Sequence, residues 1–265
     1  MSTERKAKPV SGNADASIEF RSVTYSFDSR SDNATVKNVS FRVNAGHTLV
    51  LLGRSGSGKT TLLRLINRLL VPTAGQVSVF GSPTSDWDPI VLRRRIGYVI
   101  QEGGLFPHFT VAENVAVVPK LDNWDSTRVA ARVAEMLNLV GLNPPEYADR
   151  RPRQLSGGQR QRVGVARALA ADPPILLMDE PFGALDPVTR TELQREFKSL
   201  AHRLNKTIVF VTHDLREALL LASRIILLEK GQIVADAAPN ELQNIDHPEV
   251  RAFTASLNPL DGFTQ

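Results

Sequence analysis

The stretch from Gly53 to Thr61, GRSGSGKTT, constrains the fold of this chain more than any other feature. The run HTLVLLG before it is short and continuously apolar, as in a strand that is buried on both faces. After it, leucine and isoleucine recur at helical spacing from Lys59 to Leu70. The order of strand, glycine-rich loop and helix predicts a phosphate-binding loop, because glycines let backbone N–H groups converge on phosphate oxygens.

Further apolar runs predict an α/β fold with a mostly parallel sheet, because RRIGYVIQ, PILLMDE, TIVFVTHD and RIILLEKGQIV are strand candidates separated by helical stretches. The segments SIEFRSVTYSF and VKNVSFRV alternate apolar with polar residues, as half-buried antiparallel strands do. STRVAARVAEMLNLVGL is periodic and lies in a region without a convincing strand. We therefore predict a disordered tail (1–16), an α/β core (17–101 and 160–240), an inserted helical subdomain (102–159) and a short C-terminal tail (241–265).

Composition removes several classes of chemistry. The 265 residues include no cysteine, which excludes disulfides, thiolate metal sites and cysteine nucleophiles. The net charge of +4 favours an anionic partner but does not choose between nucleotide, membrane headgroups and nucleic acid. No stretch approaches the roughly eighteen apolar residues of a spanning helix, so any membrane contact is expected to be peripheral.

The residues of the loop and of one strand end suggest nucleotide chemistry. Lys59 is expected to reach the β- and γ-phosphates, and the hydroxyl of Thr60 to ligate Mg²⁺. Asp179 ends the buried strand PILLMDE, where a phosphate-loop protein places the acid that holds Mg²⁺ through water. Glu180, directly after it, is predicted to act as a general base on an attacking water.

The stretch from Leu155 to Ala170, LSGGQRQRVGVARALA, predicts a second anion site. A serine and two glycines open a strongly periodic helix there, and the N-terminus of a helix attracts negative charge. A protein with two phosphate-binding helix ends for one nucleotide is expected to share that nucleotide between two copies.

With these motifs in place, the chain resembles the ATP-binding subunits of ABC transporters. GRSGSGKTT resembles the Walker A motif of that family, ILLMDE its Walker B motif and LSGGQ its signature. Gln101 resembles the Q-loop glutamine, Asp186 in ALD the D-loop aspartate and His213 in VTHD the switch histidine. The six motifs occur in family order between Ile18 and Ala237.

The resemblance implies a dimer that closes head to tail on two ATP molecules and reopens after hydrolysis. Phe27 lies where the family places a ring that stacks on adenine, although Tyr25 is on the same strand face and Phe27 is also compatible with a core position. The implied catalytic residues are Lys59, Gln101, Glu180 and His213. The implied nucleotide-binding residues are Phe27, Gly53, Ser55, Gly56, Ser57, Gly58, Lys59, Thr60, Thr61, Gln101, Ser156, Gly157, Gly158, Gln159, Asp179 and Asp186, with Thr60, Gln101 and Asp179 around Mg²⁺.

Two longer stretches narrow the resemblance to importers. IGYVIQEGGLFPHFTVAENVAVVPKL and LAADPPILLMDEPFGALDPVTR are similar to bacterial importers of glycine betaine, choline and carnitine. This similarity implies permease subunits that dock near Gln101 to Val115, an indirect substrate-binding partner and a peripheral place on the cytoplasmic face of the bacterial inner membrane. That subfamily often carries a pair of CBS regulatory domains, for which a chain ending at Gln265 leaves no room, so we expect ionic-strength sensing by that device to be absent. Importers of other small solutes remain the alternative.

A hypothesis from another functional class is that the chain is an ABC ATPase of DNA repair or translation. Such proteins typically need a coiled-coil insertion, a zinc module or two cassettes in one chain. Here the insert is short, cysteine is missing and one Walker A motif is present. The arginines of RRPRQLSGGQRQR flank the signature and are attributed to nucleotide-facing or solvated positions, so no nucleic-acid partner is expected.

Overall fold

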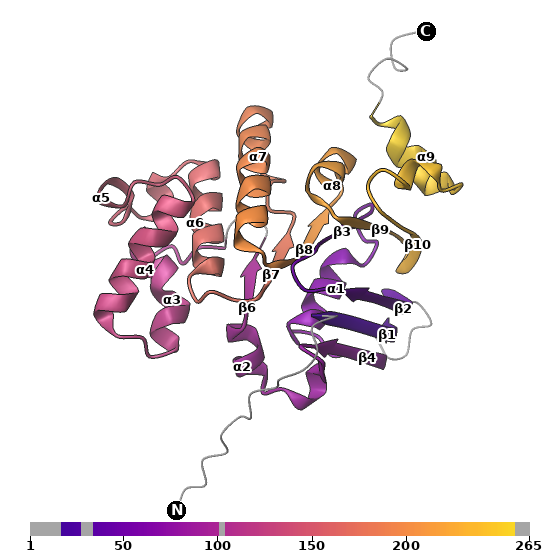
Figure 1. Ribbon diagram of the computed structural model, residues 1–265, viewed down its shortest axis with the longest axis horizontal. Helices are drawn as coiled ribbons and strands as arrows, with labels where there is room; N and C mark the ends of the chain where they lie inside the picture. Colours follow the sequence, from indigo (N-terminus) through magenta and orange to yellow (C-terminus); the bar gives the residue numbers. More distant parts are fainter. Residues whose placement is uncertain (1–16, 28–33, 101–103, 258–265) are drawn as a thin grey trace, which may run out of the picture.

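The computed structural model describes residues 17–27, 34–100 and 104–257, and two sheets organise them (Figure 1). The smaller sheet is antiparallel, in the order β2-β1-β4-β5. The larger has the order β10-β9-β3-β8-β7-β6 and is parallel except for β10. The strands are β1 (Ile18–Tyr25), β2 (Val36–Val43), β3 (Thr48–Leu52), β4 (Ala74–Val79), β5 (Ser82–Pro83), β6 (Ile96–Val99), β7 (Ile175–Asp179), β8 (Thr207–Thr212), β9 (Arg224–Glu229) and β10 (Gln232–Ala237).

Helices follow most strands of the larger sheet, and a group of them lies at one end of the molecule (Figure 1). The α-helices are α1 (Lys59–Ile66), α2 (Pro89–Arg94), α3 (Val111–Leu121), α4 (Ser126–Leu139), α5 (Pro144–Tyr147), α6 (Gly157–Leu169), α7 (Pro187–Leu204), α8 (Leu215–Leu221) and α9 (Pro248–Ala255). Short 3₁₀ helices are η1 (Thr84–Asp86), η2 (Pro152–Gln154) and η3 (Leu242–Asn244). The fold is therefore α/β, with antiparallel N-terminal strands and helices α3 to α6 inserted between β6 and β7, as the sequence predicts.

Side chains of the central strand β3 enter two different hydrophobic cores. Val50 and Leu52 pack with apolar residues of the inserted helices and α7, whereas Leu49 and Leu51 pack with α1 and the antiparallel sheet. Successive strand residues face opposite sides of a sheet. Because both sides are covered, the strand reads as a continuous apolar run, and the phosphate loop that follows it starts from a fixed point.

The structure differs from the sequence prediction at three places in the C-terminal half of the chain. The run RIILLEKGQIV forms two strands, β9 and β10, joined by a turn at Lys230 and Gly231, which both have positive φ (47° and 81°). Residues 241–257, expected as part of a short tail, contain η3 and α9, with Leu242 and Val250 buried in the core. The expected border between 159 and 160 falls inside α6, so the helical insert and the core share that helix.

Candidate active site

Lys59 is held inside the loop that follows β3. Its side chain is buried, and Nζ donates hydrogen bonds to the carbonyl oxygens of Gly53 and Arg54, each at 2.8 Å. Burial lowers the pKa of Lys59, while the nearby carboxyl groups of Glu180 and Asp179 oppose that shift. Two neutral carbonyl groups solvate a buried ammonium less well than an anion does, so the loop presents a positive charge suited to phosphate.

The backbone of the loop packs closely against the neighbouring strand β9. Gly53 has a φ of 154°, and a Cβ built on it would lie 2.5 Å from the backbone oxygen of Leu228 and 2.7 Å from Oγ of Ser57. The buried hydroxyl of Ser57 has no hydrogen-bond partner within the described part of the chain. A buried polar group without a partner is costly, and a ligand oxygen would satisfy it. The loop and the first turn of α1 carry the other predicted phosphate-binding positions, namely Ser55, Gly56, Gly58, Thr60 and Thr61.

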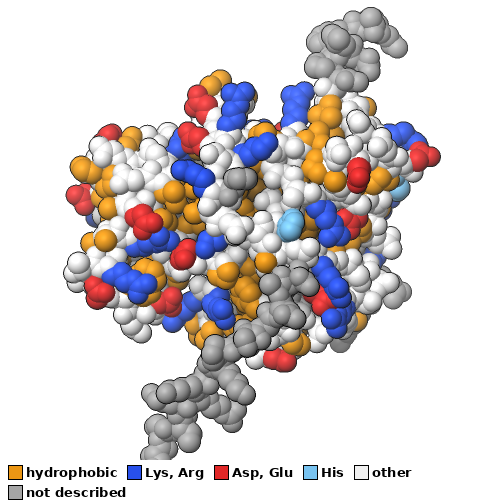
Figure 2. Space-filling model, viewed as in Figure 1, with side chains coloured by type: hydrophobic (Ala, Val, Ile, Leu, Met, Phe, Trp, Pro, Cys, Tyr) orange, Lys and Arg blue, Asp and Glu red, His pale blue; other side chains and the backbone are white. Residues whose placement is uncertain are grey.

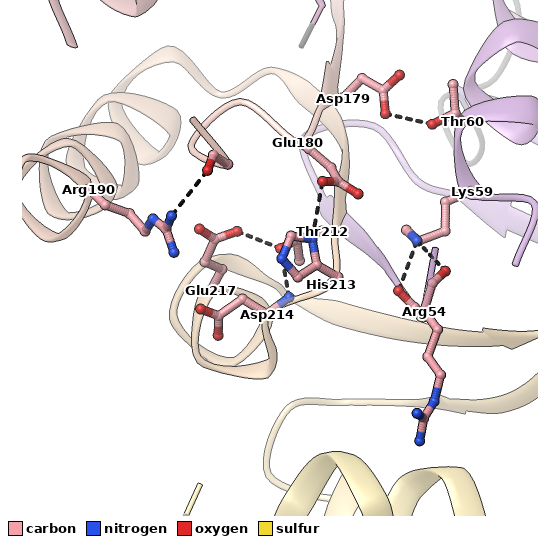
Figure 3. A network of polar contacts seen from close by, with 12 residues as sticks. Arg54, Lys59, Thr60, Asp179, Glu180, Arg190, Thr212, His213, Asp214 and Glu217 are labelled. Carbon is pink, nitrogen blue, oxygen red and sulfur yellow. Dashed lines mark hydrogen bonds and ion pairs between the residues drawn. The ribbon is translucent and has the colours of Figure 1, made fainter. Parts of the chain in front are cut away.

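Asp179 ends β7 opposite the start of α1. Oγ1 of Thr60 donates to its Oδ1 at 2.8 Å, and the hydroxyl of Tyr98 donates to its Oδ2 at 3.3 Å (Figure 3 shows the Thr60 contact). Burial raises the pKa of Asp179, and both hydrogen bonds act against this shift. Burial and the carboxylate of Asp179 raise the pKa of Tyr98 to about 12, so the phenol stays a hydrogen-bond donor.

The oxygens of Thr60 and Asp179 fit Mg²⁺. This ion takes hard oxygen ligands and is usually held by one or two protein groups together with substrate phosphates and water. Residues 17–27, 34–100 and 104–257 contain no group of three or more His, Cys, Asp or Glu side chains that could hold a metal alone. A hydroxyl and a carboxylate beside a phosphate loop are the donor set that a nucleotide-bound Mg²⁺ requires.

Glu180 and His213 meet where two neighbouring strands end (Figure 3). Oε2 of Glu180 lies 3.1 Å from Nδ1 of His213, and β7 and β8 are paired in parallel, so their carboxyl ends share one edge. Glu180 has a positive φ of 44°, a conformation that is strained for a side chain other than glycine. The side chain of His213 is 58% exposed, so the pair is open to water and ligand.

The signature residues lie on a different part of the chain. Ser156 is the N-cap of α6: its Oγ accepts from the backbone N–H of Gln159 at 3.2 Å, and its own N–H donates to Oε1 of Gln159 at 2.9 Å. Helix α6, which begins with Gly157 and Gly158, packs on α3, α4, α7 and β6. Helix α1 packs on β4, β7 and β8, and Figure 1 shows it away from α6. The described chain thus has two helix N-termini suited to anions at separate places.

Three other residues predicted to bind the nucleotide, Asp186, Phe27 and Gln101, lie in different surroundings or outside the described residues. Asp186 caps α7 through a hydrogen bond of 3.0 Å from the N–H of Thr189, and hydrogen bonds from Thr189 lower the pKa of Asp186. Phe27 is 67% exposed and meets the half-buried Tyr25 edge to face, with ring centroids 5.0 Å apart, so Phe27 is the freer ring. Gln101 lies outside the described residues.

Sequence reasoning missed the contribution of the C-terminal helix. A cavity of ≈ 650 Å³ lies beside the site and is lined by Arg54, Ser55, Glu180, His213, Ala252, Phe253 and Ser256. Helix α9 thus forms one wall, and Glu249 accepts a hydrogen bond of 3.0 Å from Nε of Arg54 in the loop. The only signal in the sequence is the weak apolar spacing of Val250 and Phe253 in an eight-residue helix.

Comparison with known proteins decides the family. The sequence profile described as ABC transporter matches residues 36–183. The chain belongs to the ABC transporter family. Among ABC relatives, the choline transport ATP-binding protein OpuBA of Bacillus subtilis (strain 168) is 53% identical over 207 residues, which are 78% of this chain and 54% of that protein. The glycine betaine uptake system ATP-binding protein YehX of Escherichia coli (strain K12) is 48% identical over 222 residues, which are 84% of this chain and 71% of that protein.

A solved ABC cassette shares the fold. The dimeric structure of an ATP-binding cassette in a post-hydrolysis state, bound to ADP and Pi, has a TM-score of 0.75 and 35% sequence identity, covering 84% of this chain and 98% of that one. The chain spans about half the length of the first curated relatives that it matches. Among the described residues, no helix is both long enough and apolar enough to cross a membrane.

Proposed function

We propose that this chain hydrolyses ATP and serves as the motor of a membrane importer. The observation that carries the proposal is the convergence of Lys59, the Thr60–Asp179 pair and the Glu180–His213 pair at one edge of the parallel sheet (Figure 3). Open α/β sheets bind their ligands outside the carboxyl ends of the strands. Strands β3, β7 and β8 all end at that edge.

Each residue has a role that follows from its place. The loop N–H groups and Lys59 bind the β- and γ-phosphates, and the unpaired hydroxyl of Ser57 gives the phosphates a further donor. Thr60 and Asp179 would hold Mg²⁺, Asp179 through water. When bound, this ion neutralises charge on the phosphate oxygens.

The Glu180–His213 pair orients and deprotonates the attacking water. The Glu180 carboxylate orients a water molecule and accepts its proton, as a general base does. His213 contacts Oε2 of Glu180, which restricts the rotation of the carboxylate, and the exposed ring is available to the γ-phosphate. Gln101 is proposed to contact the metal-bound water and to report nucleotide state to the helical insert.

A second copy of the chain is proposed to complete the site. Ser156, Gly157, Gly158 and Gln159 begin α6 at a distance from the phosphate loop of the same chain, so they serve the nucleotide of a partner. The dimeric cassette with 35% identity supports this arrangement. Phe27 would stack on the adenine, and Asp186 at the start of α7 would face the dimer contact.

Mixing two inactive variants tests this proposal. Lys59→Ala damages the phosphate loop and Ser156→Arg blocks the signature surface, so either homodimer should be inactive. In a mixed dimer, the intact signature of the Lys59→Ala chain faces the intact loop of the Ser156→Arg chain, which leaves one site whole. We expect ATP-dependent closure of the mixture, measured by fluorescence transfer between labelled chains. If monomeric wild type hydrolyses ATP at full rate and ATP closes neither the mixture nor wild type, the shared site is wrong.

The proposed cargo is a quaternary-ammonium osmoprotectant such as glycine betaine, choline or carnitine. Relatives named for choline transport and glycine betaine uptake are 53% and 48% identical to this chain over the aligned residues, which supports the proposal. A reconstituted transporter with its substrate-binding protein should therefore move these cations. If it ignores all three and moves another solute, the cargo proposal fails and the alternative, an importer of another small solute, holds.

The permease is proposed to dock on the segment from Gln101 to Val115, at the cytoplasmic face of the bacterial membrane. In the described part of this segment, Phe106 and Phe109 are 47% and 42% exposed and pack on each other with ring centroids 5.2 Å apart. Because the chain has no cysteine, a single cysteine can be introduced at Phe109. We expect it to crosslink to the permease, whereas one at the exposed Gln232 of β10 should not, and equal crosslinking would contradict the docking site.

The face in Figure 2 also bears on the nucleic-acid alternative. Lys and Arg side chains on this face are interspersed with acidic and apolar ones, and they do not gather into one continuous basic track. Nucleic-acid binding depends on a set of basic groups that neutralise several phosphates together. The face drawn in Figure 2 therefore offers no such set.

A further inference from the structure

A buried carboxylate lies behind the site, on α8. Glu217 is 4% exposed, and its two oxygens accept hydrogen bonds from Oγ1 of Thr212 at 2.5 Å and from Nε2 of Gln194 at 2.8 Å. Burial raises the pKa of Glu217, and the hydrogen bonds from Thr212 and Gln194 oppose the shift. The carboxylate is the shared acceptor of two buried donors, one on β8 and one on α7, and loss of Glu217 alone would leave both without a partner. Glu217 therefore ties the end of β8 to α7.

Thr212 connects this carboxylate to the site. It is the last residue of β8 and directly precedes His213. Its hydroxyl donates to Glu217 and accepts from the backbone N–H of Asp214 at 2.9 Å (Figure 3). One hydroxyl thus joins the residues on both sides of His213. The direction of that hydroxyl is set by Glu217, because a Thr hydroxyl carries a single proton and here donates it to the carboxylate.

Helix α7 connects the same network to the loop that carries Glu180. Gln194, which donates to Glu217, lies four residues after Arg190, so both are on one face of the helix. Nη2 of Arg190 donates to the carbonyl oxygens of Gly183 at 3.2 Å and Leu185 at 3.1 Å, which follow Glu180 in the chain. The loop of Glu180 and the loop of His213 are therefore held by adjacent turns of one helix.

We propose that Glu217 is a positioning residue for His213, acting through the hydroxyl of Thr212. The carboxylate fixes the backbone around His213 from inside the contact of α7, α8 and β8, and so keeps the imidazole 3.1 Å from Glu180. This inference rests on the proposed function, in which His213 and Glu180 act on ATP. It adds a residue that touches neither the nucleotide nor the water.

The test is a steady-state ATP hydrolysis assay on the full chain, with variants matched in burial. Thr212→Val removes the hydroxyl at nearly constant shape, and Thr212→Ser restores it. Thr207→Val is the control, since Thr207 is at the other end of the same strand, is also buried, and uses its hydroxyl to accept from the N–H of Gly46 at 3.1 Å. Each valine variant leaves a backbone N–H without its acceptor and also breaks one side-chain contact, with Glu217 at Thr212 and with Ser17 at Thr207, where the two hydroxyls are 3.1 Å apart.

We expect Thr212→Val to lower kcat about ten- to hundred-fold, because displacement of a positioned group by about 1 Å can cost that much. KM for ATP should stay within about twofold, and Thr212→Ser and Thr207→Val should keep most of the wild-type kcat. Glu217→Met, which removes the acceptor of the Thr212 hydroxyl, should lower kcat as much as Thr212→Val does. The two losses should not add in the double variant, since both break the same bond.

The same variants made in a His213→Ala chain distinguish a positioning role from damage to the fold. In a His213→Ala chain the group to be positioned is gone, so Thr212→Val should lower the remaining kcat by less than about twofold. Equal losses with and without His213, or a loss in Thr207→Val as large as in Thr212→Val, would overturn the inference while leaving the proposed function intact. Wild-type turnover in His213→Ala would overturn the role of His213 itself, and with it the inference.

Discussion

A matched pair of glycine substitutions measures how closely the phosphate loop is packed. Gly53 and Gly56 both have positive φ, 154° and 77°, in regions that side chains other than glycine rarely adopt, so alanine costs of order 1–3 kcal/mol of backbone strain at either position. A Cβ at Gly56 meets nothing within 4 Å, whereas one at Gly53 would lie 2.5 Å from the backbone oxygen of Leu228. That oxygen belongs to β9 and cannot move without its strand. Gly53→Ala therefore carries an additional overpacking cost of about 1–3 kcal/mol.

The difference between the two variants is the informative quantity, because the lower entropy of the unfolded chain with alanine affects both alike. In urea unfolding without nucleotide, an m-value near 3 kcal/mol per M converts the extra cost into a midpoint about 0.3–1 M lower for Gly53→Ala than for Gly56→Ala. A Gly56→Ala midpoint at or below that of Gly53→Ala would refute the reasoning, since the close approach to Leu228 would then have no energetic effect.

Three other substitutions probe the proposed general base, the hydrophobic core and a buried carboxyl group. Glu180→Gln should keep ATP affinity and lower turnover about 10²–10⁴-fold, because an amide cannot take the proton; wild-type hydrolysis rates would exclude Glu180 as the base. Phe210→Ala should lower the free energy of unfolding in urea by about 3–5 kcal/mol, because its ring packs on Phe182 and Phe197 with centroids 5.7 and 6.3 Å apart; a loss below about 1 kcal/mol would contradict this. Burial raises the pKa of Glu217 above its ordinary 4.5, so the unfolded chain ionises first as the pH rises. Wild type should therefore lose stability relative to Glu217→Gln as the pH rises from 4.5 through the folded-state pKa, and a difference independent of pH would rule out this burial penalty.

Local motifs made part of the site predictable. The phosphate loop is built from consecutive residues, so its spacing identifies Lys59 and Thr60 without knowledge of the fold. Asp179 and Glu180 are likewise recognisable because they directly follow a buried apolar run. Backbone conformation and helix polarity act over a few residues, and a sequence reports such short-range effects directly.

Contacts across the sheet were not predictable in the same way. The apolar runs of β3, β6, β7 and β8 look alike, and nothing in them states that the order is β9-β3-β8-β7-β6. The contact of Tyr98 with Asp179 depends on β6 lying next to β7. In the same way, the wall formed by α9 depends on how the C-terminal segment folds back to bring Glu249 to Arg54.

The sequence by itself thus determined the family, the phosphate loop and the chemical groups proposed for the site, because each is recognised from a short motif of consecutive residues. Only the tertiary structure decided which groups meet: Thr60 with Asp179, Glu180 with His213, and Glu217 behind Thr212. Those meetings require particular strands to pair and α7 to pack against α8. Strand order and helix packing arise from the burial of apolar surface, which is non-directional, so the apolar pattern of an element shows that it is buried but not which element it packs against.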